Sequence, residues 1–294
     1  MTDLWPNLFI VGAAKAGTTS LHAYLGDHPD IFMSAVKEPH YFSRLQPSER
    51  RRAFLPTVDD EKDYLALFRA GGDKPVRGES STSYLTVPEA AGRIRRACPD
   101  SKAVIALRDP VERAYSHFLA DTRDGIEDRG FREALEDELS GREEGGWGAA
   151  HLYVRTGLYA EPVRRYQETF GEDLMVVFFE RLKEDPIAVV EDVLAFLNVS
   201  TSHARSLSPE AHNPHRVPRS RLARRVFTSG VVRRLSRRIL PRDLRARAKD
   251  SLTRTSPKPG LSDSDREFLL EVFREDVGRL PALLGSVPPW PAFA

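Results

Sequence analysis

The chain alternates short apolar runs with longer segments whose apolar positions recur at helical spacing. Such runs are typical of strands buried in a parallel sheet, and the segments between them are typical of amphipathic helices. The pattern therefore predicts an α/β fold with a mainly parallel central sheet. The predicted strands are residues 8–11, 76–79, 102–107 and 174–179, and the predicted helices include 88–97, 131–139, a segment through Tyr166 and Phe170, a helix opened by Asp185 and Pro186, and 262–284.

The first apolar run leads into a glycine loop and then into a helix. Gly12 and Gly17 bound the loop, and Thr18, Thr19 and Ser20 open the helix. A helix N-terminus presents free backbone amides and the positive end of the helix dipole, so this arrangement favours an anion. The sequence predicts a phosphate-binding loop and a P-loop-like, three-layer α/β/α fold. An ordinary strand–helix turn with a chance pair of glycines is the alternative.

The position of the lysine separates this loop from the P-loop of nucleotide-hydrolysing enzymes. That motif carries its lysine directly after the second glycine. Here position 18 is Thr, and the cation of the loop, Lys15, lies between the two glycines. We therefore expect a phosphate-binding loop without ATPase chemistry, while a P-loop kinase or nucleotidase stays open as an alternative.

A second cation follows the third predicted strand. Arg108 stands at the carboxyl end of this strand, which is the edge where open α/β sheets bind ligands. Its guanidinium suits bidentate recognition of a phosphate, and Ser116 in the next helix supplies a hydroxyl. The alternative is that Arg108 pairs with a nearby carboxylate.

Composition narrows the class of protein without giving a function. The chain has 294 residues, 40% hydrophobic and 30% charged, which is ordinary for a globular protein. We expect one domain over 1–294, with an α/β core in 1–200 and a basic helical region in 201–294. The single cysteine, Cys98, excludes an internal disulfide framework and a cysteine-based metal cluster, and fits a reducing compartment.

Targeting and charge lead to two further expectations. We see no signal peptide and no apolar run long enough to span a bilayer, so we expect a cytoplasmic protein. The formal net charge of +1 gives no sign of a nucleic-acid partner, and we expect none.

The C-terminal part of the chain is rich in arginine. Residues 216–249 hold Asp243 as their only acid, and apolar residues are interspersed among the arginines. This pattern predicts one or two basic amphipathic helices. Three interpretations stay open: a solvated face over the sheet, a rim for an acidic substrate, or peripheral contact with an anionic membrane.

Three motifs together resemble the sulfotransferases that use 3′-phosphoadenosine 5′-phosphosulfate (PAPS). The resemblance is closest to the heparan sulfate sulfotransferase branch and its bacterial relatives. It covers residues 4–200 well and the remainder loosely. The motifs are Ala-Ala-Lys-Ala-Gly-Thr-Thr-Ser at 13–20, Lys-Glu-Pro-His-Tyr-Phe at 37–42 and Leu-Arg-Asp-Pro-Val-Glu-Arg-Ala-Tyr-Ser at 107–116.

The resemblance implies an activity and a role for each matched residue. The protein is expected to transfer a sulfuryl group from PAPS, its co-substrate, to a hydroxyl or amine of a carbohydrate, glycolipid or small molecule, without a metal. Lys15 would contact the bridging oxygen and the transferred group, Glu38 would be the catalytic base, and His40 would face the acceptor beside it. The implied catalytic residues are Lys15, Glu38 and His40, and the implied PAPS-binding residues are Lys15, Ala16, Gly17, Thr18, Thr19, Ser20, Arg108, Ser116, Arg216, Arg219 and Lys258.

The chain departs from the pattern of the branch at one residue and in one loop. Ser80 follows Glu79, where the branch often has a lysine. The late loop over the 3′-phosphate has no firm match in this chain. A non-catalytic module that binds anions or a membrane surface therefore stays open as a third interpretation. The candidates for the late loop are Arg216, Arg219, Ser220 and Lys258.

Overall fold

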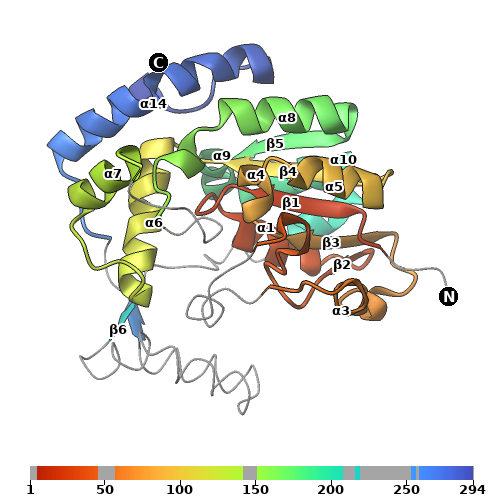
Figure 1. The fold of residues 1–294 in the computed structure, drawn as a ribbon. Helices are drawn as coiled ribbons and strands as arrows, with labels where there is room; N and C mark the ends of the chain where they lie inside the picture. The colour runs from red at the N-terminus through yellow and green to blue at the C-terminus, as the bar shows by residue number, and fades with distance from the viewer. Residues whose placement is uncertain are drawn as a thin grey trace.

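A five-stranded parallel sheet forms the centre of the protein (Figure 1). The computed structural model describes residues 5–45, 57–141, 151–207 and 258–293, and the backbone alone of 216–218 and 253–255. The strand order is β2-β3-β1-β4-β5, and each neighbouring pair is parallel. The strands are β1 (Leu8–Gly12), β2 (Ile31–Met33), β3 (Val76–Ser80), β4 (Lys102–Leu107) and β5 (Leu174–Phe178).

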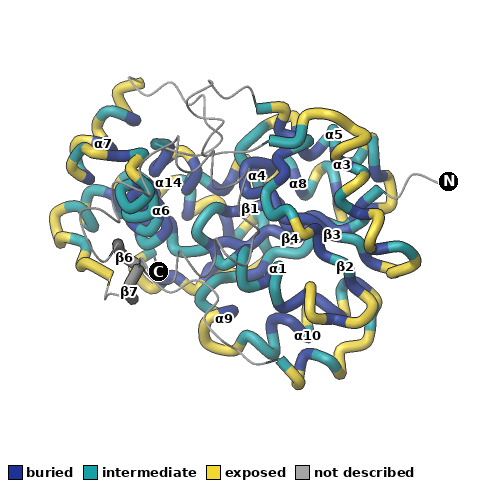
Figure 2. Tube along the Cα trace, turned by 90° about the horizontal axis from the view of Figure 1, so that it is seen from below, coloured by how far each residue is buried: buried dark blue, intermediate teal, exposed yellow. Residues whose placement is uncertain are grey.

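Helices cover both faces of this sheet, so the predicted three-layer fold is confirmed. In Figure 2, α4, α5 and α8 lie on one side of the strands, and α1 and α10 lie on the other. Further helices, α6 and α7, lie beyond the carboxyl ends of the strands (Figure 1). The helices are α1 (Thr18–Gly26), α3 (Glu61–Ala66), α4 (Ser83–Thr86), α5 (Ala90–Ala97), α6 (Pro110–Asp124), α7 (Phe131–Leu139), α8 (Ala160–Phe170), α9 (Phe179–Glu184), α10 (Pro186–Phe196) and α14 (Asp263–Leu284).

The core is densest along the two central strands. Every residue of β1 is buried, as are residues 103–107 of β4, because helices cover both faces of a parallel sheet. By contrast, β5 is mostly half-buried at the edge of the sheet, although its residues belong to the most apolar run of the chain. The interior strands therefore hold the carboxyl ends of β1 and β4 in fixed positions side by side.

One predicted helix start and one short strand differ between the sequence prediction and the structure. The helix expected at residue 88 begins at Ala90, because Val87 to Glu89 form a turn that the Ala90 amide closes onto the Val87 carbonyl. The three-residue strand β2 is missing from the sequence prediction, since so short a run carries no period. The strands at 8, 76, 102 and 174 and the helices α7, α10 and α14 are confirmed.

The C-terminal part combines a short antiparallel pair with a long helix. Strand β6 (Arg216–Pro218) pairs antiparallel with β7 (Thr253–Thr255), so the first three residues of the arginine-rich segment lie in a strand. The rest of 216–249, with Arg219 and Ser220, lies outside the described residues.

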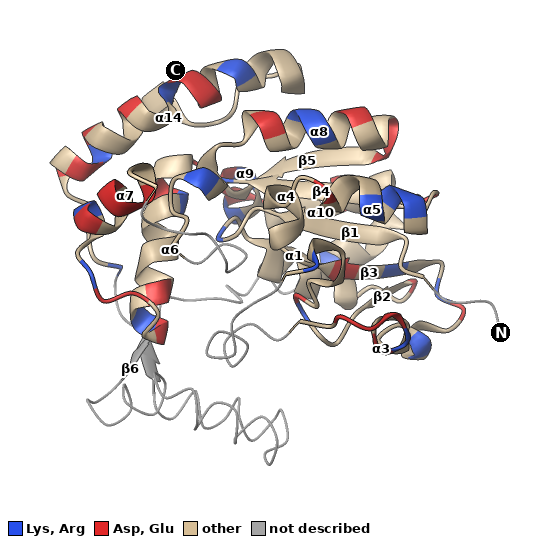
Figure 3. Cartoon of the chain, in the orientation of Figure 1, with Lys and Arg blue, Asp and Glu red and all other residues tan. Residues whose placement is uncertain are grey.

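The long helix α14 packs against α6 and α8 and closes this end of the molecule (Figure 1). Acidic side chains outnumber basic ones on the outer helices α7, α8 and α14 (Figure 3). These helices together hold twelve acidic and six basic residues, so the surface that they form is net acidic. Among the described residues, none of the helices is both long and apolar enough to cross a bilayer.

Candidate functional site

The glycine loop joins β1 to α1 and passes very close to its neighbours. A Cβ atom on Gly12 would lie 2.7 Å from the Leu85 Cβ, and one on Gly17 would lie 2.9 Å from side-chain atoms of Phe179 and Leu182. Gly17 also has a φ of 87°, in the left-handed region, and it caps the N-terminus of α1. Only glycine meets both demands, so the loop backbone lies tightly against α4 and α9.

Lys15 stands within this loop, in a left-handed conformation with φ of 69°. Burial, together with the charge of Arg123, lowers the pKa of its ammonium group to about 8, while the charge of Asp124 opposes the shift. A lysine with this pKa is mostly charged at neutral pH, yet it is held where hydration is poor. An anion placed beside it would restore the lost stabilisation.

Arg108 lies directly against the same loop. Its Nη1 donates to the Lys15 backbone oxygen at 3.1 Å, and its guanidinium lies 4.5 Å from the centre of the Phe179 ring. The residue follows β4, and Asp109 then caps α6 by accepting from two backbone amides. The guanidinium is therefore fixed between the loop and α9, at the carboxyl edge of the sheet.

Glu112, one turn into α6, connects Arg108 to the C-terminal part of the chain. Its carboxylate lies 3.9 Å from Arg108, 3.0 Å from Lys258 and 2.8 Å from Arg266. Burial would raise the pKa of Glu112, but hydrogen bonds from Arg266 and Lys258 overcome that effect and lower it. Arg108 thus pairs with a carboxylate, as the alternative interpretation expected, and Lys258 reaches the same neighbourhood.

Glu38 lies beside the carboxyl end of β3, the strand next to β1 in the sheet. Its backbone amide donates to the Ser80 carbonyl at 2.8 Å, and its carboxylate accepts from Lys37 at 2.6 Å and from Thr82 at 3.4 Å. Burial opposes ionisation, but the charge and hydrogen bond of Lys37 and the charge of Lys15 lower the pKa of Glu38 below its usual range. Glu38 is therefore ionised at neutral pH and able to accept a proton.

His40 is buried beside this carboxylate. Its Nδ1 is 2.7 Å from the Ser83 hydroxyl, and its Nε2 is 3.5 Å from Glu38 Oε2, just beyond hydrogen-bond reach. This Nε2 is buried with no hydrogen-bond partner. Burial also lowers the pKa of His40, so its ring is neutral at pH 7. The histidine thus presents a free ring nitrogen on the side of Glu38.

These groups lie at the carboxyl ends of neighbouring strands. Arg108 follows β4 and contacts the backbone of the loop that follows β1. Glu38 and His40 lie beside the end of β3, where the Glu38 amide donates to the Ser80 carbonyl and the His40 amide donates to Ser81 Oγ. The carboxyl edge of the sheet therefore carries the glycine loop, Arg108, Glu38 and His40.

The other predicted residues divide into three groups. Ala16 and Thr18 are buried in the loop and the first turn of α1, and Thr19 and Ser20 are half-buried there. Ser116 is half-buried on α6, one turn beyond Glu112 and on the same face. For Arg216 only the backbone is described, and Arg219 and Ser220 lie outside the described residues.

Sequence reasoning missed several neighbours that shape this site. The motif at 37–42 was recognised, but the pairing of Lys37 with Glu38 follows from local geometry. Four hydroxyl residues, 80–83, lie at the end of β3 and directly after it. Ser80 contacts His22 at 2.8 Å, and the Thr82 side chain does not cap α4. Their density after a strand was the available signal.

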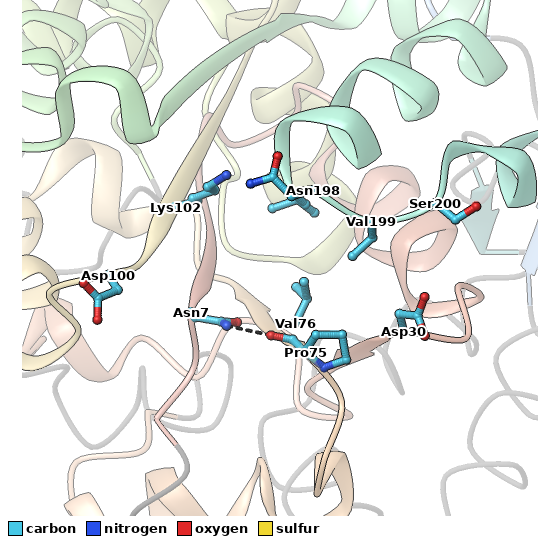
Figure 4. A pocket seen from close by; sticks show the side chains of 10 residues that line it. Asn7, Asp30, Pro75, Val76, Asp100, Lys102, Asn198, Val199 and Ser200 are labelled. Atoms are coloured by element: carbon cyan, nitrogen blue, oxygen red, sulfur yellow. Dashed lines mark hydrogen bonds between the residues drawn. The ribbon is translucent and has the colours of Figure 1, made fainter.

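A separate pocket lies at the opposite edge of the sheet (Figure 4). It is lined by residues at the amino ends of strands, such as Val76 and Lys102, and by Asn198 and Ser200. The Asn7 amide there is already bonded to the Pro75 carbonyl at 2.8 Å. Ligands of open α/β sheets bind at the carboxyl edge, so this pocket is not the predicted site. Within the described part of the chain, no cluster of His, Cys, Asp and Glu has the makings of a metal site.

Comparison with families and solved structures gives a consistent result. The model of the Sulfotransferase family matches residues 6–203. A crystal structure described as a sulfotransferase from Alicyclobacillus acidocaldarius is 34% identical, with a TM-score of 0.74, and the match covers 96% of this chain and 97% of that one.

Curated relatives are similar over a shorter part. Human heparan sulfate glucosamine 3-O-sulfotransferase 6 is 31% identical over 196 residues, which are 66% of this chain and 53% of that protein. Mouse carbohydrate sulfotransferase 15 is 31% identical over 150 residues, 39% of this chain and 27% of that protein. The chain thus spans about half the length of the heparan sulfate relative.

Proposed function

The chain belongs to the sulfotransferase family, and we propose that it transfers a sulfuryl group from PAPS to a hydroxyl or amine of a carbohydrate acceptor. The observation that carries this proposal is the contact of Arg108 with the backbone of Lys15 at 3.1 Å. This contact fixes the Arg108 guanidinium against the glycine loop, and it supports a site in which Arg108 and Lys15 face one small molecule. An ionised carboxylate, Glu38, stands in the field of the same lysine.

The residues present fit a donor with two separated anionic groups. The loop amides of 16–19 and Lys15 suit the 5′-phosphosulfate, because a helix N-terminus and an under-hydrated ammonium both favour an anion. Arg108, with Ser116 on α6, suits the 3′-phosphate. Lys258, at 3.0 Å from Glu112, is the described candidate for the late loop over that phosphate.

The chemistry follows from positioning and charge. Sulfuryl transfer by in-line displacement builds negative charge on the leaving phosphate and on the transferred oxygens, by analogy with phosphoryl transfer. Lys15 and the loop amides would stabilise that charge, and preorganised donors of this kind are worth roughly 3–4 kcal/mol each. Glu38, ionised at neutral pH, would take the acceptor proton, a contribution of about 10²–10⁴ in rate.

The acceptor is the finer part of the proposal. The relatives named for heparan sulfate glucosamine and for carbohydrates favour a sugar, with a glycolipid or small molecule as alternatives. The arginine-rich residues 216–249 are proposed to contact an anionic acceptor or an anionic membrane surface. We expect a protein without a nucleic-acid partner and place it in the cytoplasm.

The decisive experiment is transfer of ³⁵S from labelled PAPS to a panel of glycans, glycolipids and phenols. Wild type should label at least one acceptor, and Lys15→Ala and Glu38→Gln should lose transfer while keeping the melting temperature. A thermal-shift titration separates the alternatives. Adenosine 3′,5′-bisphosphate should stabilise the protein, whereas stabilisation by Mg·ATP alone would point to a kinase or nucleotidase.

A further inference from the structure

A fully buried carboxylate, Glu79, lies at the end of β3, behind the residues just described. It accepts hydrogen bonds from three hydroxyls: Tyr64 at 2.8 Å, Tyr84 at 2.6 Å and Ser81 at 2.7 Å. An ionised carboxylate can only accept, so all three hydroxyls must direct their protons toward it. The remaining lone pairs of these hydroxyls therefore face outward, where each is able to accept a further hydrogen bond.

Two of the three hydroxyls use that capacity on the segment 38–42. Ser81 Oγ accepts from the His40 backbone amide at 3.0 Å, and the Tyr84 hydroxyl accepts from the Phe42 amide at 3.3 Å. The Tyr64 hydroxyl is equally buried, but the hydrogen bonds of the described residues give it no amide from this segment. One carboxylate thus holds two backbone amides of the segment through two relaying hydroxyls.

The segment needs such support because its backbone is strained. Glu38 has a φ of 59° and His40 a φ of 57°, in the left-handed region that non-glycine residues rarely adopt. Conformations of this kind persist only where the surroundings impose them. Without the two relays, the segment would gain freedom to relax, and the Glu38 carboxylate and the His40 ring would move with it.

We propose that Glu79 is a positioning residue for the transfer reaction: through Ser81 and Tyr84 it fixes the backbone that carries Glu38 and His40. The proposal rests on the proposed function for the role of Glu38. The hold of Glu79 on the backbone of 38–42, through Ser81 and Tyr84, is a property of the fold and is measurable without any acceptor. Glu79 does not touch substrate and is not a catalytic residue.

Protonation of Glu79 should loosen this hold. Burial raises its pKa to about 7, while the three hydroxyls oppose the rise. A protonated carboxyl would donate to one of the three hydroxyls, and that hydroxyl would turn its own proton away from Glu79. Where that hydroxyl is Ser81 or Tyr84, its relay would lose the orientation that the ionised carboxylate imposes. The groups that face Glu79 are Tyr64 of α3, Tyr84 of α4 and Ser81, with Tyr166 of α8, Cys98 and Glu38 also in its field.

Three substitutions test whether Glu79 positions the segment 38–42, or whether the three hydroxyls only stabilise its buried charge. Tyr64→Phe, Tyr84→Phe and Ser81→Ala each remove one bond to Glu79, but only the last two remove a relay. We expect amide hydrogen exchange of a peptide spanning 38–44 to accelerate about tenfold or more in Tyr84→Phe and Ser81→Ala, since an opening of roughly 1.4 kcal/mol is tenfold. In Tyr64→Phe, exchange there should stay at the wild-type rate.

Kinetics supply the second readout, with PAPS and heparan sulfate as substrates. The two relay variants should lose kcat roughly 10- to 100-fold with KM for PAPS unchanged, because a misplaced base affects the chemical step. The Tyr64→Phe control should keep kcat within about twofold of wild type, a difference well under 1 kcal/mol. Melting temperatures should fall in all three variants, and further in the two relay variants, because each of these loses a second hydrogen bond.

The outcomes are distinct. Equal exchange and equal kcat in Tyr64→Phe and Tyr84→Phe would overturn the positioning role and leave Glu79 as a structural charge. If Tyr84→Phe does not fold, Ser81→Ala decides the question alone. An active Glu38→Gln would sink the proposed base. In that case accelerated exchange in the relay variants would still support the hold.

Discussion

Single side chains in this site combine burial with charge. Burial lowers the pKa of both Lys15 and Arg108, so each is a cation whose hydration is incomplete. A bound anion compensates for lost hydration more strongly there than on an open surface. The loop and the end of β4 are therefore prepared for a doubly anionic ligand before any ligand arrives.

The lysine gives a pH limit for donor binding. Lys15 is charged below a pKa of about 8 and loses its charge above it. We expect kcat/KM for PAPS to fall about tenfold per pH unit beyond that value, because this ratio reports the free enzyme. Lys15→Arg keeps its charge, so its profile should stay level to higher pH even if its rate is lower. A wild-type profile that is flat to pH 10 would contradict the assignment.

The arginine gives a prediction for affinity. Arg108→Ala should weaken binding of adenosine 3′,5′-bisphosphate roughly 10- to 100-fold in calorimetry, the value of one to two charge-assisted hydrogen bonds. Arg164, on α8, is a matched control because it also pairs with glutamates one turn away. Arg164→Ala should bind as wild type does. Unchanged affinity in Arg108→Ala would remove Arg108 from the phosphate site.

At the scale of elements, the turn from β1 into α1 depends on contacts as well as on backbone conformation. Gly17 has a left-handed φ, and a Cβ at this position would lie 2.9 Å from side-chain atoms of Phe179 and Leu182 in α9. The helix that follows begins at Thr18 with its first amides directed out of the turn. Packing of α9 thus determines where those amides point.

Two glycines distinguish these effects. Gly17→Ala adds both backbone strain and a Cβ at 2.9 Å from α9. Gly285→Ala adds strain alone, since Gly285 is also left-handed, with a φ of 67°, and nothing lies within 4 Å. We expect Gly285→Ala to cost about 1–2 kcal/mol of unfolding free energy. Gly17→Ala should cost about 1 kcal/mol more, from overpacking, and should also lose bisphosphate binding. If urea denaturation gives equal losses of unfolding free energy in the two variants, the side chains of Phe179 and Leu182 move aside at little cost.

At the scale of the whole molecule, the C-terminal residues support the site from behind. Trp290 is buried, and its indole donates to Glu180 at 3.2 Å; Glu180 in turn accepts from the Asp109 amide at 3.0 Å, next to Arg108. Asp276 of α14 accepts from the amides of Tyr159 and Ala160 at the start of α8. The final helix therefore packs directly on α8, one of the helices that cover the sheet.

The cap on α8 predicts a change in stability that leaves the site intact. Asp276→Ala should lower the unfolding free energy by about 1–2 kcal/mol, because the first amides of α8 lose their acceptor. Asp263→Ala, an exposed change in the first turn of α14, should cost only a few tenths of a kcal/mol. Bisphosphate affinity should be unchanged in both folded variants. Loss of affinity in Asp276→Ala would mean that α8 moves Arg108.

The sequence predicted the parts of the site that lie in contiguous runs. Lys15 and Arg108 follow apolar strands, and parallel strands place their carboxyl ends together, so both cations were foreseeable. The carboxylate network was not, because Tyr64 lies fifteen residues from Glu79 on a helix whose apolar spacing suggested only packing. Which hydroxyl meets which amide depends on the order of strands in the sheet, and spacing along the chain does not encode that order.

The short ion pair between Lys37 and Glu38, 2.6 Å long, has a consequence for substrate choice. An incoming nucleophile competes with the ammonium group for the carboxylate. A sugar bearing its own sulfate or carboxylate offers Lys37 a substitute counterion, and so releases the base at the moment of docking. Charged glycans should then be sulfated faster than uncharged glycans of the same skeleton, and raising the ionic strength should reduce this difference in rate. A preference that is indifferent to salt would mean that the ammonium group plays no part in acceptor selection.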